Sequence, residues 1–309
     1  MKKLLHAALT LIMIFTSIFS VLGYFGVSHW LLDLPSHFKP QYLIVLVVGT
    51  SILLVSKKRI ALIFAPFILA SAFEVVPLYF GGNKNNELTS STKIVCINLL
   101  SSNRQFEAVE QFIESKSPDI IVLQEFSPLW QQMLEPKFAA YPYQLALPRN
   151  DNFGIAVYSK VSFSELKELT VGPAGLPSIQ GDFELDGKTV TLMATHPLPP
   201  VGPEYFKLRN GQLSELGKLA SASPNEFILL GDLNTSSFSF HFKALLKESN
   251  LIDSRKGFGL LTTWPTWFLP AQTTLDHCLV SQGIYVKSRE VGPDIGSDHL
   301  PIFIELGVE

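Results

Sequence analysis

Two short segments of the chain carry side chains suited to phosphate-ester chemistry. Residues 231–234 read Gly-Asp-Leu-Asn directly after the apolar run 227–230, and residues 297–301 read Ser-Asp-His-Leu-Pro. A carboxylate, a carboxamide and an Asp-His pair at strand ends can hold a hard divalent cation and a phosphate while activating water. Each segment alone also suits a simple turn or cap, because Asp, Asn and Ser bond to nearby backbone. Together they indicate a metal-dependent phosphoester hydrolase.

Glu125 adds a third candidate group. It closes the run 120–124, of which four residues are Ile, Val or Leu. A carboxylate at the end of such a run is costly to desolvate without a partner or a metal ion.

Further short segments occur in the order found in the endonuclease/exonuclease/phosphatase superfamily. They are Asn98 after the strand-like run 93–97, Leu-Gln-Glu at 123–125, Gly-Ile-Ala at 154–156, Thr-His at 195–196, Arg209 and Gln212 on a helical stretch, Thr-Trp-Pro at 263–265 and Asp-His at 276–277. One such segment is a weak signal, but the ordered set over about 93–305 is specific. The chain therefore resembles this superfamily, whose members have the deoxyribonuclease-I-like fold.

The resemblance implies a metal site and a water-activating site. Asn98, Glu125 and Asp298 would supply oxygen ligands to Mg²⁺ or Mn²⁺. Asp232 and Asn234 would orient or deprotonate the attacking water.

The remaining candidates would contact the substrate. His299, oriented by Asp298 or Asp276, would donate hydrogen bonds to the phosphoryl oxygens, and His196 would assist the leaving group. Arg209 is a candidate phosphate clamp. Trp264, with Trp267 and Phe268, would line the pocket mouth or simply pack on the domain. His277 stands where many members carry tyrosine, so its role stays open.

The resemblance also implies a four-layer α/β sandwich, in which two packed, mainly antiparallel sheets are flanked by helices. The sequence pattern agrees with amphipathic helices at 107–116 and 205–219 and with a hairpin of strands 179–185 and 189–195. That pattern alone would allow several α/β folds.

The first 82 residues indicate a membrane anchor. Residues 4–25 contain His6 but no Asp, Glu, Lys or Arg, and residues 60–80 contain Glu74 as their only residue of these four types. Both stretches can cross a hydrocarbon core of ~30 Å. Between them, 42–55 is uncharged but only 14 residues long, which is short for a span. We expect three transmembrane helices at about 4–25, 40–56 and 60–80, a linker at 83–92 and a catalytic domain at 93–309. A cleavable signal peptide is the alternative for the first segment, and it leaves the chain anchored.

The basic residues predict the orientation of the anchor. Lys2 and Lys3 precede the first segment, and residues 57–59 (Lys-Lys-Arg) separate the second from the third. With three spans both clusters lie in the cytoplasm, so the catalytic domain lies on the periplasmic or extracytoplasmic side of the inner or plasma membrane. If the second segment did not cross the membrane, the prediction would reverse and the catalytic domain would face the cytosol. Glu74 is either a functional intramembrane carboxylate or an interfacial residue.

Charge weighs on the choice of substrate. Six of the 24 Lys and Arg and two of the 27 Asp and Glu precede residue 83, so the remainder carries 18 positive and 25 negative groups, a net charge of about −7. Proteins that bind long duplex DNA usually present a basic surface. The substrate is thus either a nucleic acid or a phospholipid headgroup, cleaved by a nuclease-like phosphodiesterase or by a sphingomyelinase-like or phosphoinositide-phosphatase-like enzyme.

Other functional classes have less support. A non-catalytic, membrane-anchored binding domain should lack at least one of the central motif residues. All six are present: Asn98, Glu125, Asp232, Asn234, Asp298 and His299. The absence of Gly-x-Ser-x-Gly and P-loop motifs argues against serine-hydrolase and nucleoside-triphosphatase mechanisms. Cys96 and Cys278 permit either a disulfide or two buried thiols. The expected partners are a phosphoester substrate and a lipid bilayer, and no protein partner is inferable.

Overall fold

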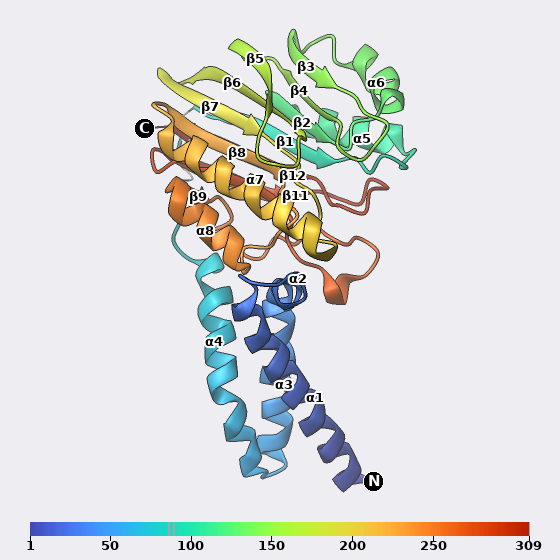
Figure 1. Cartoon of the computed structure of the whole chain (residues 1–309), viewed down its shortest axis with the longest axis vertical. Coiled ribbons are helices and arrows are strands. Elements are labelled where there is room, and N and C mark those ends of the chain that lie inside the picture. Colours follow the sequence, from blue (N-terminus) through green and yellow to red (C-terminus); the bar gives the residue numbers. More distant parts are fainter. Residues whose placement is uncertain (86, 89, 309) are drawn as a thin grey trace.

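The computed structural model describes residues 1–85, 87–88 and 90–308 as a helical stem that carries an α/β sandwich (Figure 1). Three stretches of the stem are long and apolar enough to cross a membrane: Lys2–Phe25, Trp30–Val55 and Arg59–Tyr79. Their helices are α1 (Lys2–Leu22), α2 (Trp30–Asp33), α3 (Lys39–Val55) and α4 (Ala65–Val75), with the 3₁₀ segments η1 (Gly23–Phe25), η2 (Leu34–Phe38), η3 (Arg59–Phe64) and η4 (Val76–Tyr79).

The second stretch is longer than the uncharged run 42–55 indicated. Helix α3 begins at Lys39, and helical turns extend back to Trp30, so the apolar helical stretch has 26 residues. The buried Lys39 ammonium donates to the Ser20 carbonyl oxygen at 2.7 Å, which lets a charged residue lie within the helical stem. In Figure 1 the N-terminus and the α3–α4 turn lie at the same end of the stem, away from the domain.

The domain contains two six-stranded sheets, with strand orders β11-β12-β1-β2-β4-β3 and β5-β6-β7-β8-β10-β9. Two neighbouring pairs, β1 with β2 and β7 with β8, are parallel, and the others are antiparallel. The first sheet comprises β1 (Thr92–Asn98), β2 (Ile120–Gln124), β3 (Tyr143–Leu147), β4 (Ile155–Ser159), β11 (Ile284–Val291) and β12 (Ile302–Val308). The second comprises β5 (Phe163–Thr170), β6 (Pro177–Leu185), β7 (Lys188–Ala194), β8 (Glu226–Asp232), β9 (Ile252–Asp253) and β10 (Asp276–Val280).

Three apolar clusters hold the layers together. One lies between the sheets and includes Ile94, Ile179 and Ile304. The second joins the first sheet to α5 (Phe106–Lys116) and α6 (Pro128–Leu134), which continues into η5 (Glu135–Lys137). The third joins the second sheet to α7 (Gly202–Ala222) and α8 (Phe240–Ser249). The expected four-layer sandwich is confirmed. Cys96 and Cys278 are both buried free thiols.

Polar contacts fix the stem to the domain. Asp33 pairs with Arg209 of α7 at 2.7 Å, and Glu74 pairs with Lys243 of α8 at 2.6 Å. Glu74 therefore lies at the domain end of the stem. Residues 83–85, in the predicted linker, run beside β11, where the Asn85 N–H donates to the Val286 carbonyl oxygen at 3.0 Å.

Candidate active site

The candidate residues meet at one edge of the sandwich, where strand ends converge. Strands β1 and β2 are parallel in one sheet, β7 and β8 are parallel in the other, and the antiparallel β10 and β12 begin at the same edge. Asp232, the last residue of β8, lies opposite Asp276, the first residue of β10. The chain thus brings residues from six strand ends into one place.

A pocket of about 390 Å³ opens there. Its polar lining includes Glu125, His196, Asp232, Asn234, Asp298 and His299. Much of the rest is apolar: Leu34, Phe38, Phe153, Pro199, Pro200, Val201, Trp264 and Leu275.

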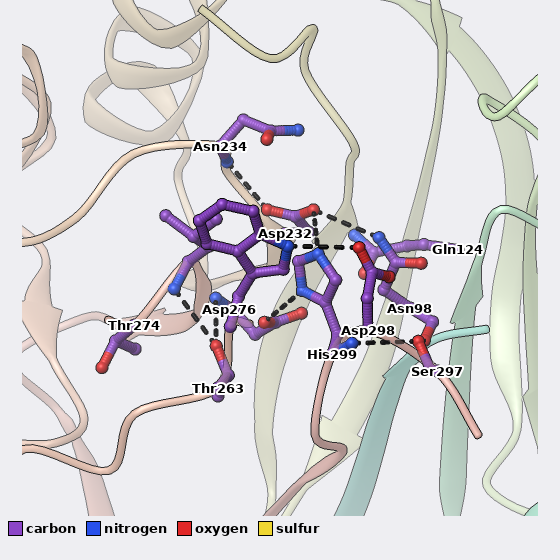
Figure 2. A network of polar contacts seen from close by, with 12 residues as sticks. Asn98, Gln124, Asp232, Asn234, Thr263, Thr274, Asp276, Ser297, Asp298 and His299 are labelled. Atoms are coloured by element: carbon purple, nitrogen blue, oxygen red, sulfur yellow. Dashed lines mark hydrogen bonds and ion pairs between the residues drawn. The ribbon is translucent and has the colours of Figure 1, made fainter. Parts of the chain in front are cut away.

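Asp232 lies at the centre of the polar network (Figure 2). Its Oδ2 accepts from Asn98 Nδ2 at 3.2 Å and lies 3.4 Å from His196 Nε2 and 3.6 Å from His299 Nε2. Its Oδ1 accepts from the Asn234 N–H at 2.9 Å. Burial alone would raise the pKa of Asp232, but the charge of His299 and the contacts with His196 and Asn234 lower it to about 2. Asp232 is therefore an ionised carboxylate at neutral pH.

His299 is held in one orientation by Asp276. The His299 Nδ1 lies 2.9 Å from Asp276 Oδ2, and Figure 2 shows Asp276 beside the ring, with Asp232 on its other side. Burial would lower the pKa of His299, but the charges of Asp276 and Asp232 outweigh it and raise the pKa to about 10. The ring is thus protonated at neutral pH, so that Nδ1 donates to Asp276 and Nε2 carries a proton that faces Asp232. Of the two orienting residues expected, Asp276 makes this contact.

Two carboxylates in the pocket suit a hard cation. Asp298 Oδ2 accepts from the Trp264 indole N–H at 3.1 Å, while the buried Asp298 Oδ1 has no hydrogen-bond partner among the described residues. Glu125 Oε2 accepts from the Ser101 N–H at 3.0 Å. No group of three His, Cys, Asp or Glu side chains in the described part of the chain is arranged to hold a metal. A Mg²⁺ ion does not need one, because it usually binds through one or two carboxylates, waters and substrate phosphate.

Asn98 faces these carboxylates with its NH₂ group. Asn98 Nδ2 donates to Glu125 Oε1 at 3.3 Å as well as to Asp232, and its amide oxygen accepts from the Leu100 N–H at 3.1 Å. The NH₂ group cannot coordinate a cation, so any ligand role of Asn98 would fall to its amide oxygen, which has a second lone pair. The geometry suits a residue that orients two carboxylates.

Two other candidates lie outside the pocket lining. The Arg209 side chain is fully buried, where one Nη bonds Asp33 and the other donates to the Asn234 carbonyl oxygen at 2.8 Å. This geometry contradicts the predicted phosphate clamp, because the guanidinium is already paired with Asp33 of the stem and does not face the pocket. His277 is also fully buried, and its Nε2 contacts the Thr235 carbonyl oxygen at 2.8 Å. Both side chains support the loop that follows Asp232.

Three pocket residues come from the stem, and the sequence motifs did not indicate them. Leu34, His37 and Phe38 belong to η2 and line the same pocket as Asp232. His37 belongs to none of the sequence motifs and would be interpreted from the sequence alone as an ordinary interfacial or surface histidine. The available signal was its position in a short polar break between two apolar segments.

Gly231 lets the two sheets approach each other behind Asp232. A Cβ there would collide with the Thr195 carbonyl oxygen and the Gln124 amide, and the residue has φ +149°. We expect Gly231→Ala to lower the free energy of unfolding by about 3 kcal/mol, through overpacking added to backbone strain. Gly187→Ala, in the β6–β7 turn, has φ +81° but meets no atom within 4 Å, so it should cost only about 1 kcal/mol. Thermal unfolding of the full chain in detergent measures both, and equal losses would contradict the prediction.

Comparison with known proteins agrees with the fold. D. rerio TDP2 in complex with a single-stranded DNA product is 17% identical, with a TM-score of 0.57, over 71% of this chain and 100% of that chain. The human Nocturnin catalytic domain with bound sulfate is 18% identical, with a TM-score of 0.58, over 71% of this chain and 95% of that chain. A functionally unknown protein from Enterococcus faecalis V583 is 18% identical, with a TM-score of 0.58, over 70% of this chain and 100% of that chain. These identities establish a shared fold alone.

A comparison with curated proteins found no match. The model of the Endonuclease/Exonuclease/phosphatase family matches residues 95–299, which is more than half of the chain and includes every polar residue of the pocket named above. The chain therefore belongs to the endonuclease/exonuclease/phosphatase family of phosphoester-hydrolysing enzymes.

Proposed function

We propose that the chain is a membrane-anchored, divalent-metal-dependent phosphoester hydrolase whose catalytic groups are those around Asp232. The observation that carries this proposal is the ionised Asp232, which lies within 3.6 Å of two histidine Nε2 atoms in a pocket that also contains Glu125 and Asp298. Such a set can bind a phosphate, activate water and protonate a leaving group.

Glu125 and Asp298 would hold Mg²⁺ or Mn²⁺, and the partnerless Asp298 Oδ1 is the atom with a free coordination position. When bound, the ion neutralises charge on the phosphate and polarises its oxygens. Asn98 would keep Glu125 and Asp232 in position through its two N–H bonds.

The chain's own residues would then perform the proton transfers. Asp232 and Asn234 orient the attacking water, and the Asp232 carboxylate accepts its proton. Protonated His299 donates from Nε2 to a phosphoryl oxygen as negative charge builds, because Asp276 holds its other nitrogen. His196, whose Nδ1 has no partner in the described part of the chain, lies close enough to the pocket to assist the leaving oxygen.

The orientation of the enzyme is part of the proposal. Lys2, Lys3 and residues 57–59 belong to the end of the stem away from the domain (Figure 1). Because basic residues favour the cytoplasmic side, the domain would lie on the extracytoplasmic side of the inner or plasma membrane.

The metal site gives the direct test. In the full-length chain in detergent, Glu125→Gln is expected to raise the Mg²⁺ concentration for half-maximal hydrolysis of bis(4-nitrophenyl) phosphate by about 10- to 100-fold, since one of the few anionic ligands is lost. The matched control is Glu165→Gln, an exposed position on β5 outside the pocket lining. Full activity with unchanged Mg²⁺ dependence in Glu125→Gln would exclude Glu125 as a ligand.

A further inference from the structure

The membrane stem forms one wall of the catalytic pocket. Leu34, His37 and Phe38 line it from η2, which lies in the N-terminal part of the second apolar helical stretch, Trp30–Val55. His37 is fixed there, because its Nδ1 accepts from the Ser236 N–H at 3.1 Å and its carbonyl oxygen accepts from the Thr273 hydroxyl at 3.0 Å. These contacts place η2 at the domain end of the stem, where the helices would leave the bilayer, so the pocket would open near the depth of the lipid headgroups.

Large apolar side chains are exposed on the side of the domain that faces the stem. Trp267 and Leu269 are 75% and 72% exposed, and Val201, which also lines the pocket, is 72% exposed. The loop that carries Trp267 and Leu269 is tied to the stem where the Gln41 side chain donates to the Gln272 carbonyl oxygen at 2.7 Å. In Figure 1 this loop projects from the stem side of the domain, beside α2.

Exposed apolar residues continue onto the adjoining part of the stem. Phe25 and Leu31, at the domain end of the helices, are 57% and 53% exposed. Contiguous exposed apolar surface marks a binding or membrane face, and tryptophan favours the membrane–water interface. Exposed apolar side chains suited to the interface and acyl region of a bilayer therefore lie on the stem side of the domain, and one of them, Val201, also lines the pocket.

The charge distribution disfavours a polynucleotide in this pocket. None of the described residues that line it is Lys or Arg. The chain from residue 83 onward carries 18 basic and 25 acidic residues. A long polyanion is bound mainly through phosphate neutralisation, which needs a basic track on the protein. A substrate with a single phosphate and apolar substituents does not need such a track. The metal site and the histidines would bind its phosphate, and the apolar walls of the pocket would contact its apolar substituents.

We propose that the substrate is an amphiphilic phosphoester of the bilayer, a phospholipid whose phosphate enters the pocket while its acyl chains stay against the apolar rim. This inference rests on the proposed hydrolase function. Water adds to the phosphorus, the P–O bond to the leaving alkoxide breaks, and that alkoxide takes up a proton. The products are one alcohol and one phosphate monoester when the substrate is a diester.

The deciding experiment compares substrates with and without acyl chains. The full-length protein is reconstituted into vesicles of phosphatidylcholine and phosphatidylglycerol with Mg²⁺. Its kcat/KM on these lipids is compared with that on glycerophosphocholine, glycerophosphoglycerol and a single-stranded oligonucleotide. We expect at least one lipid to exceed all three soluble diesters by about 100-fold or more, because the remote acyl chains supply binding energy to the reaction.

A pair of variants tests the apolar rim. The double variant Trp267→Ser and Leu269→Ser is expected to lower the ratio of lipid to bis(4-nitrophenyl) phosphate turnover by about tenfold, because membrane affinity scales with buried apolar area. The control is Met133→Ser with Tyr143→Ser, at positions 40% and 38% exposed on α6 and β3, far from the stem in Figure 1. The ratio should not change in the control.

The outcomes separate this inference from the proposed function. Turnover of a soluble diester or the oligonucleotide equal to or above that of every lipid would overturn the lipid inference and leave the hydrolase intact. An unchanged ratio in the Trp267/Leu269 variant would also overturn it. Loss of all activity, including on bis(4-nitrophenyl) phosphate, would overturn the proposed function itself.

Discussion

Replacement of Asp232 by asparagine is expected to lower kcat for a phosphodiester by about 10³-fold or more. Asp232 accepts hydrogen bonds from Asn98 and Asn234 and lies next to both histidines. It is thus the buried anion that all four residues contact. Asparagine keeps the shape but cannot accept the proton of the attacking water. It also removes one of the charges that raise the pKa of His299 to about 10.

The control must show that the loss is chemical. Asp186→Asn makes the same change in the exposed β6–β7 turn, where Asp186 has φ +49° and asparagine is well tolerated. It should keep the activity of the original chain. Initial rates with saturating Mg²⁺, together with thermal unfolding of both variants, separate catalysis from folding. Retention of more than about a tenth of the original kcat in a folded Asp232→Asn variant would exclude the role of general base, which typically supplies 10²- to 10⁴-fold.

The sandwich was implied by the family resemblance, whereas the position of the site residues at strand ends could be predicted from the sequence for a physical reason. Asn98, Glu125, Asp232 and Asp276 each lie at a strand terminus, and the backbone of parallel and antiparallel pairs brings such termini to one edge. Once the fold is known, their proximity follows from register alone.

The roles of Arg209 and His37 could not be obtained in this way. Both depend on how the stem docks onto the domain, through contacts between residues 176 and 199 positions apart. An arginine on an amphipathic helix gives no sign of whether its guanidinium faces a pocket or a buried carboxylate from another segment. Lys39 at the start of α3 also depends on packing that the sequence does not show, because its ammonium bonds the Ser20 carbonyl oxygen and lies 3.6 Å from the centre of the Tyr24 ring.

The buried Asp33–Arg209 pair is expected to give the largest stability effect in the molecule. Both side chains are fully buried, and the Arg209 Nη to Asp33 Oδ2 distance is 2.7 Å. Asp33 also accepts from the Ser239 hydroxyl at 2.7 Å. Burial lowers the pKa of Arg209, and the charge of Asp33 opposes this effect. Asp33→Ala leaves the guanidinium buried without its partner, and we expect the free energy of unfolding to fall by about 3–5 kcal/mol.

The double variant Asp33→Leu with Arg209→Met gives the sharper result. Removal of both charges with apolar side chains is often near neutral for stability, so most of the loss in Asp33→Ala should be absent. Denaturant unfolding of the full chain in detergent measures both variants. The exposed Lys218–Glu215 pair is the control, and Glu215→Ala should cost less than about 1 kcal/mol. A double variant as unstable as Asp33→Ala would contradict the account.

The same double variant decides between the two roles of Arg209. Arg209 donates to the carbonyl oxygen of Asn234, which lies in the loop after Asp232 and has φ +49°. Without that bond the loop should be held less firmly, and kcat should fall while KM for a soluble diester changes little. A phosphate clamp would behave in the opposite way, since loss of a substrate contact weakens binding and raises KM. A rise in KM at unchanged kcat would therefore restore the clamp. The reverse split would make the membrane stem, acting through Asp33 and Arg209, a structural support of the catalytic loop.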